Sequence, residues 1–61
     1  MEKYVEENKR LREQLKALLK TLLESERQSR ERDIASDKLR ESIMWLGQDL
    51  DALGVPSPYK Q

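Results

Sequence analysis

Basic side chains and serines are concentrated in the middle of this sequence. The cations of this segment are Arg27, Arg30, Arg32, Lys38 and Arg40, and its hydroxyls are those of Ser25, Ser29 and Ser36. Guanidinium and ammonium groups bind phosphates well. If a helix begins here, its free amide groups also attract an anion, whereas cations at that end oppose the helix dipole. This pattern indicates an anion-binding site, but ordinary salt bridging with the acids of the same segment explains it more readily from the sequence alone.

The residue types needed for most enzymes are missing. The chain has no histidine and no cysteine, so the usual general base, nucleophile and zinc ligands are absent. Its two glycines form no phosphate-binding loop. Glu6 and Glu7 are neighbours on a helix and point about 100° apart, which does not suit a shared metal ion. We expect no catalysis, no metal and no cofactor.

The charge balance argues against a nucleic-acid or membrane partner. Charged residues make up 39% of the chain, but acids and bases number 12 each, so no net field attracts DNA or an anionic membrane. No apolar run approaches the ~20 residues of a membrane span. Residues 1–7 lack the cationic and apolar regions of a signal peptide. We therefore expect a cytoplasmic protein.

A chain of this length needs a source of stability besides its own hydrophobic core. A single chain of 61 residues rarely obtains more than about 3 to 5 kcal/mol from its core. Disulfides and a structural metal are excluded by the composition, which leaves self-association. The predicted fold class is all-α: a two-helix antiparallel hairpin, residues 1–54, that assembles into a compact homo-oligomer.

The first helix is predicted over residues 3–24. An apolar stripe with alternating steps of four and three places one face of this helix against a partner. The stripe consists of Tyr4, Asn8, Leu11, Leu15, Leu18 and Leu22. Asn8 is the polar member, and such a residue either sets register and oligomer number or lies at a frayed end.

The second helix is predicted over residues 28–53, after an apolar-free segment at 24–33. Its start is uncertain: Ser25 with Gln28 has capping-box spacing, and Ser29 or Asp33 could also cap it. Gly54, followed by Pro56, predicts the end of this helix and a non-helical tail over 55–61. The apolar positions expected in its core or in an oligomer interface are Leu39, Ile43, Trp45, Leu46 and Leu50. Gly47 is costly inside a helix and predicts a close approach of another backbone, or less readily of a ligand.

Residues 29–47 resemble the signature of a helical hairpin domain shared by phage proteins that defeat CBASS and Thoeris immunity. The matching positions are Arg30, Glu31, Ala35, Lys38, Leu39, Glu41, Met44 and Trp45. Residues 53–59 are similar to the proline- and tyrosine-containing ends of small members. The departures are Asp33, where serine is common, Arg40, where an acid is common, and Ser42, where alanine is common.

The resemblance implies a protein, often a hexamer, that sequesters cyclic nucleotide signals between protomers without cleaving them. The expected ligands are cyclic di- and trinucleotides or cyclic ADP-ribose isomers in the cytoplasm of an infected bacterial host. We expect Arg30, Ser36 and Lys38 to contact phosphate, with Arg32 assisting. Tyr4 could stack on a base, although packing is the more common role of such an aromatic residue.

Two other functions remain open from the sequence. A structural coiled-coil adaptor would use the apolar stripe to bind a partner helix and would bind no nucleotide. A small nucleic-acid-binding regulator is disfavoured by the zero net charge.

Overall fold

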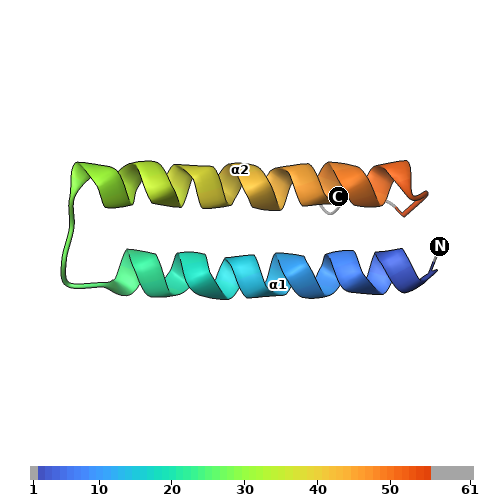
Figure 1. Cartoon of the computed structure of the whole chain (residues 1–61), viewed down its shortest axis with the longest axis horizontal. Coiled ribbons are helices and arrows are strands. Elements are labelled where there is room, and N and C mark those ends of the chain that lie inside the picture. Colours follow the sequence, from blue (N-terminus) through green and yellow to red (C-terminus); the bar gives the residue numbers. More distant parts are fainter. Residues whose placement is uncertain (1, 56–61) are drawn as a thin grey trace.

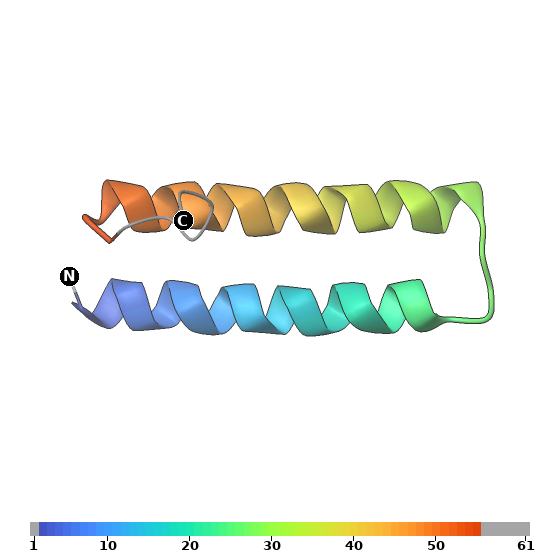
Figure 2. The same cartoon turned by 180° about the vertical axis from the view of Figure 1, so that it is seen from behind.

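The computed structural model describes residues 2–55, which form two antiparallel helices (Figures 1 and 2). Helix α1 spans Glu2–Glu24 and helix α2 spans Arg30–Ala52, and residues 25–29 connect them. The hairpin measures 40 × 18 × 18 Å. The predicted all-α hairpin is therefore confirmed for a single chain.

Helix α2 begins two residues later than predicted, because Ser29 is its N-cap. The backbone of Ser29 is extended, and its Oγ accepts a hydrogen bond of 3.1 Å from the amide of Arg32. Ser25 and Gln28 do not form the predicted capping box. Ser25 Oγ accepts from the amide of Arg27 at 3.3 Å, and the side chain of Gln28 donates to the carbonyl of Ser25 at 2.8 Å. These bonds stabilise the connection rather than the helix start.

The C-terminal end of α2 follows the prediction for Gly54. This glycine has a φ of 86°, in the left-handed region that an L side chain disfavours. Its amide donates to the carbonyl of Asp51 at 3.0 Å, and the amide of Val55 donates to Leu50 at 2.9 Å. This pair of bonds is a Schellman motif. The rest of the predicted tail, residues 56–61, lies outside the described residues.

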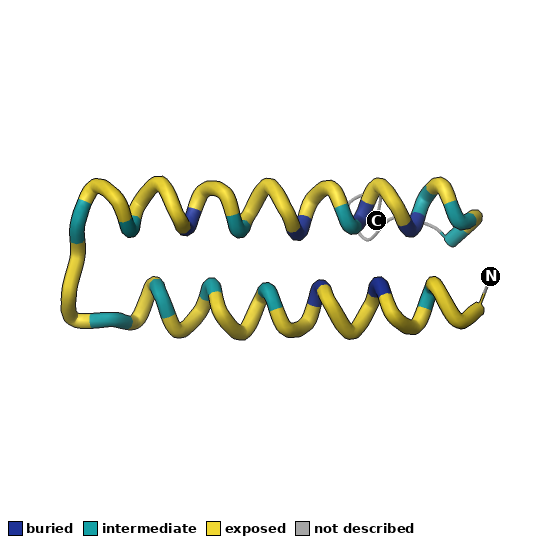
Figure 3. The backbone as a smooth tube through the Cα atoms, in the orientation of Figure 1, coloured by how far each residue is buried: buried dark blue, intermediate teal, exposed yellow. Residues whose placement is uncertain are grey.

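The hydrophobic core of one hairpin is small. Buried residues lie only on the sides of the helices that face each other (Figure 3). Within residues 2–55, the buried hydrophobic side chains are Ile43, 7% exposed, and Leu50, 2% exposed. The half-buried leucines are Leu15, Leu19, Leu22, Leu39, Leu46 and Leu53. A core of this size supplies little stability to an isolated chain.

The apolar stripe predicted for the first helix does not all face α2. Tyr4, Leu11 and Leu18 are exposed, and they recur every seven residues along one edge of α1. The residues that face α2 are Asn8, Arg12, Leu15, Leu19 and Leu22. One antiparallel neighbour does not cover a stripe this wide. The stripe is therefore divided between the contact of α1 with α2, which we call the seam, and an exposed edge of α1.

The seam is polar at the end that holds the first turns of α1. Asn8 is 3% exposed, and its Nδ2 donates to the carbonyl of Leu46 at 3.0 Å and to Asp49 Oδ2 at 2.8 Å. The buried Arg12 side chain donates from Nε to the carbonyl of Ile43 at 3.5 Å. Asn8 is thus an ordered member of the seam and does not lie at a frayed end.

Gly47 is buried within this polar part of the seam. The carbonyl of Ile43 points along the helix toward position 47, and it is this carbonyl that accepts from Arg12. The close approach of another backbone or of a ligand at Gly47 stays a prediction.

Candidate anion-binding site

The basic segment lies at the connection and the first turns of α2. Arg30 and Arg32 are in the first turn, next to the acidic residues Glu31 and Asp33. Acids at a helix N-terminus offset the dipole. These two acids therefore offset part of the unfavourable interaction between the cations and the helix dipole that the sequence suggested.

Arg32 stabilises the connection between the helices. Its Nη1 donates to Ser25 Oγ at 2.7 Å and to the carbonyl of Arg27 at 3.4 Å. Its side chain is half-buried. The guanidinium has further N–H groups, and a phosphate near the connection would find Arg32 already oriented.

Ser36 does not fit its predicted role as a phosphate contact. It is 6% exposed, on the inner face of α2, and its hydroxyl donates to the carbonyl of Asp33 at 2.8 Å. A phosphate arriving from solvent does not reach this group. The burial of Ser36 in the hairpin argues against the predicted phosphate contact and fits a role in the packing of the two helices.

Lys38 and Arg40 are exposed and make pairs along their own helix. Lys38 Nζ lies 3.6 Å from Glu41, and Arg40 lies 3.7 Å from Asp37. Exposed pairs of this kind contribute roughly 0.3 to 0.5 kcal/mol. Such weak pairs leave both cations able to bind another anion.

The outer face of α2, which points away from α1, carries exposed cationic and apolar side chains. Trp45 is 66% exposed, and Ile34 is also exposed. At about 100° per residue, Ile34, Lys38 and Trp45 fall within roughly 40° of one another. The exposed Arg30 lies beside this row. Trp45 is therefore not part of the hairpin core, and we call Arg30, Ile34, Lys38 and Trp45 the outer face of α2.

One hairpin does not gather all the predicted ligand contacts. Arg32 lies on the seam side of α2, whereas Arg30 and Lys38 lie on its outer face. Tyr4 is exposed at the other end of the hairpin, where Lys3 Nζ lies 5.5 Å from its ring centroid. Tyr4 and Arg30 could contribute to one ligand only if they came from different copies.

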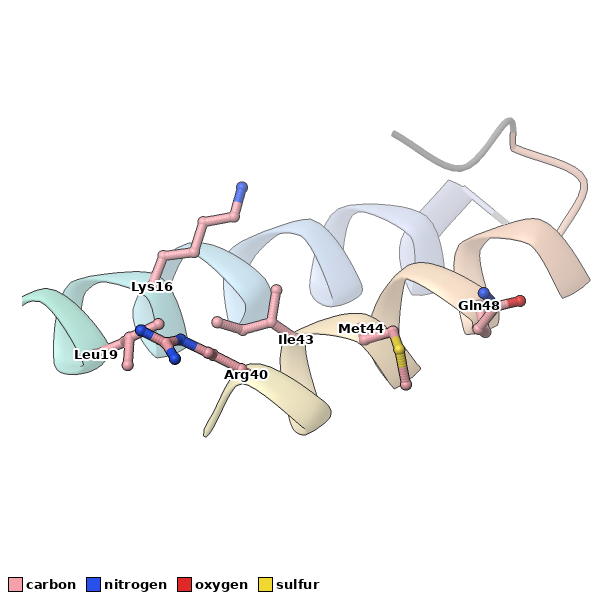
Figure 4. Close-up of a pocket in the computed structure, with 6 residues that line it drawn as sticks. All are labelled: Lys16, Leu19, Arg40, Ile43, Met44 and Gln48. Carbon is pink, nitrogen blue, oxygen red and sulfur yellow. The ribbon is translucent and has the colours of Figure 1, made fainter. Parts of the chain in front are cut away.

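Two grooves, both lined by residues of the two helices, run beside the seam. The larger groove, of about 600 Å³, is lined by Lys16, Leu19, Arg40, Ile43, Met44 and Gln48 (Figure 4). The smaller, of about 280 Å³, is lined by Tyr4, Glu7, Asn8, Leu11, Leu46, Asp49 and Leu53. We call them the basic groove and the acidic groove, after the charged residues that line each one.

Several groove residues were missed from the sequence. Lys16, Met44 and Gln48 flank the predicted apolar stripes, and Arg40 was noted as a cation of the basic segment but not as part of a groove. The signal that could have found them is helical spacing: Lys16 precedes Leu19 by three positions, and Arg40 precedes Ile43 by three.

The described part of the chain contains no cluster of three or more acidic, histidine or cysteine residues that could hold a metal ion. Neither helix, over residues 2–55, has an apolar stretch long enough to cross a membrane.

Comparisons with protein-family models, with curated proteins and with solved structures give no match for this chain.

Proposed function

We propose that this protein is a phage immune-evasion sponge. It binds cyclic nucleotide second messengers, either cyclic di- and trinucleotides or cyclic ADP-ribose isomers, in pockets between copies of the hairpin. It holds these signals without cleaving them and so keeps the host effector silent in the cytoplasm of the infected cell. The resemblance of residues 29–47 to the sponge hairpin domain supports this proposal.

The outer face of α2 is the observation that carries the proposal. A cyclic nucleotide presents phosphates and flat bases, and it needs cations beside a flat apolar surface. Lys38 supplies a cation about two turns from the exposed indole of Trp45, which supplies the surface, and Arg30 supplies a second cation about two turns before Lys38. None of these side chains is needed for the core of the hairpin, and Arg32 adds an oriented guanidinium at the connection.

The small core supports a site built between copies. Seven large hydrophobic residues are exposed within residues 2–55: Tyr4, Leu11, Leu18, Leu23, Ile34, Met44 and Trp45. An assembly would bury many of them and would stabilise the chain. It would also bring Tyr4 of one copy near the cations of another. A hexamer is the assembly that the resemblance implies.

A calorimetric titration tests the proposal. The assembled protein is titrated with cyclic di- and trinucleotides and cyclic ADP-ribose isomers, with the linear dinucleotides as matched controls. We expect tight binding of at least one cyclic ligand, and release of the same intact ligand on heating. Absence of binding across the panel would overturn the proposal, and release of a cleaved product would identify an enzyme.

A coiled-coil adaptor is the second candidate. The observation that favours it is the exposed heptad row of Tyr4, Leu11 and Leu18 along α1, which suits a partner helix. An adaptor would capture a helical peptide and leave the cyclic nucleotides unbound.

A further inference from the structure

The two grooves carry opposite charge. Among residues 2–55, the charged residues that line the basic groove are Lys16 and Arg40, without an acid. Those that line the acidic groove, within the same range, are Glu7 and Asp49, without a cation. Both grooves have apolar floors, of Leu19, Ile43 and Met44 in one and of Leu11, Leu46 and Leu53 in the other.

The two grooves open on opposite faces of the hairpin. Glu7 and Lys16 are nine positions apart on α1, and Arg40 and Asp49 are nine apart on α2. At about 100° per residue, nine positions correspond to roughly half a turn, so on each helix the acid points away from the cation. The grooves share no lining residue. Each hairpin therefore presents an acidic apolar face and a basic apolar face, back to back.

We propose that the acidic groove of one copy docks against the basic groove of the next. Opposite charges then meet across the contact, which selects this pairing over acid on acid or base on base. The exposed Leu11 of the first copy is then covered by the apolar floor of the second. The weak pairs of Lys16 with Glu13, 3.5 Å, and of Arg40 with Asp37, 3.7 Å, leave both cations able to face a new partner.

The docking has consequences for the shape of the assembly. Because the two surfaces differ, the contact is heterologous, and repeated contacts of this type close into a ring or continue as a filament. The outer face of α2 takes no part in this contact, so a ligand pocket between copies on that face requires a second contact within the assembly. The inference rests on the self-association that the proposed function includes.

Charge reversal tests the docking. The variants are Glu7→Lys in the acidic groove, Lys16→Glu in the basic groove, and the two combined. Sedimentation and native mass spectrometry give the mass of each at several concentrations. We expect each single reversal to weaken association about tenfold, because like charges then face each other. The combined variant, and an equimolar mixture of the two single variants, recover the wild-type mass.

The controls are Glu6→Lys and Lys20→Glu, which make the same charge changes at exposed positions that line neither groove. Both are expected to assemble like the wild type, and circular dichroism verifies the helical content of every variant. A monomeric wild type, an effect of only one reversal, or failure of the combined variant to recover would overturn the docking.

Nucleotide titration of the same samples separates this inference from the proposed function. A wild type that binds a cyclic nucleotide but whose mass does not respond to the reversals would refute the docking alone. An assembly that responds as expected but binds no cyclic nucleotide would refute the sponge alone.

Discussion

The side-chain amide of Asn8 donates a hydrogen bond of 2.8 Å to Asp49 Oδ2, which joins the first turns of α1 to the last turns of α2. The same amide donates to the carbonyl of Leu46, while Asn8 Oδ1 is buried without a partner among the described residues. A buried asparagine of this kind lowers stability but selects one register, because only one alignment satisfies its amide. The pair therefore specifies how the two helices align.

Replacing Asn8 with leucine should stabilise the hairpin and weaken its specificity. The unsatisfied Oδ1 is removed and apolar contact with Leu46 and Leu53 is added, which we expect to raise the free energy of unfolding by about 1 kcal/mol. Asp49 is exposed and remains solvated. Thermal unfolding measures the gain, and native mass spectrometry should show more than one assembly.

Asn8→Ala is the matched control, because it removes the amide without adding apolar contact. We expect it to lower the free energy of unfolding by about 1 kcal/mol. If Asn8→Leu destabilises as much as Asn8→Ala, the bond to Asp49 is a net source of stability and the register argument fails.

The N-cap of α2 should contribute measurably to stability. Ser29→Ala removes the acceptor for the amide of Arg32, and we expect a loss of about 1 kcal/mol in unfolding free energy. Ser29→Asp should retain most of the stability. Ser42→Ala is the control within the same helix, because Ser42 is exposed and bonds only back to the carbonyl of Lys38. Equal effects of the alanine changes at 29 and 42 would show that Ser29 is no cap.

Local features of the hairpin could be predicted from the sequence. The end of α2 depends on Gly54 and the residues next to it, and the existence of each helix depends on the spacing of its leucines. These signals act within a few residues and need no knowledge of the rest of the fold.

The choice of the buried edge of α1 could not be predicted in the same way. Leu11 and Leu19 are equally apolar, yet only Leu19 turns toward α2, because the seam is selected by the pairing of both helices. Arg12 was missed for the same reason: a buried arginine contradicts the hydrophobic pattern, and its acceptor is a backbone carbonyl on the other helix.

The candidate site shows a second limit of reading along the chain. Arg30, Arg32, Ser36 and Lys38 are close in sequence, but their spacing places them on different sides of a helix. Helical angles alone would have separated the outward Arg30 and Lys38 from the inward Ser36. The bonds of Arg32 to the connection needed the structure.

Replacing Gly47 with alanine should destabilise the hairpin, although the same change usually stabilises a helix by about 1 kcal/mol. Gly47 is buried, and Arg12 donates to the carbonyl of Ile43 one helical turn before it, so we expect the added methyl group to crowd this approach. We therefore expect a lower melting temperature for Gly47→Ala and a larger decrease for Gly47→Leu.

A double-mutant cycle tests whether position 47 is a glycine because Arg12 approaches the carbonyl of Ile43. In an Arg12→Leu background no guanidinium approaches the carbonyl of Ile43, so Gly47→Ala should regain part of its ordinary helix-stabilising effect. Equal effects of Gly47→Ala in both backgrounds would show that the glycine serves another contact.

Arg30 should contribute to ligand binding and little to folding. It is the exposed cation of the outer face at the start of α2, and loss of a guanidinium–phosphate contact should weaken binding at least about tenfold. Calorimetry with the ligand that binds the wild type measures this change. Arg10→Ala is the matched control. Arg10 is an exposed arginine on α1 away from the basic segment, and the variant should bind the ligand normally.

Arg32→Ala should lower the melting temperature as well as the affinity for the ligand, because it also removes the hydrogen bonds of Arg32 to Ser25 and Arg27 in the connection. If Arg30→Ala changes the assembly mass, or if Arg10→Ala weakens binding as much, the outer face of α2 is not the ligand site.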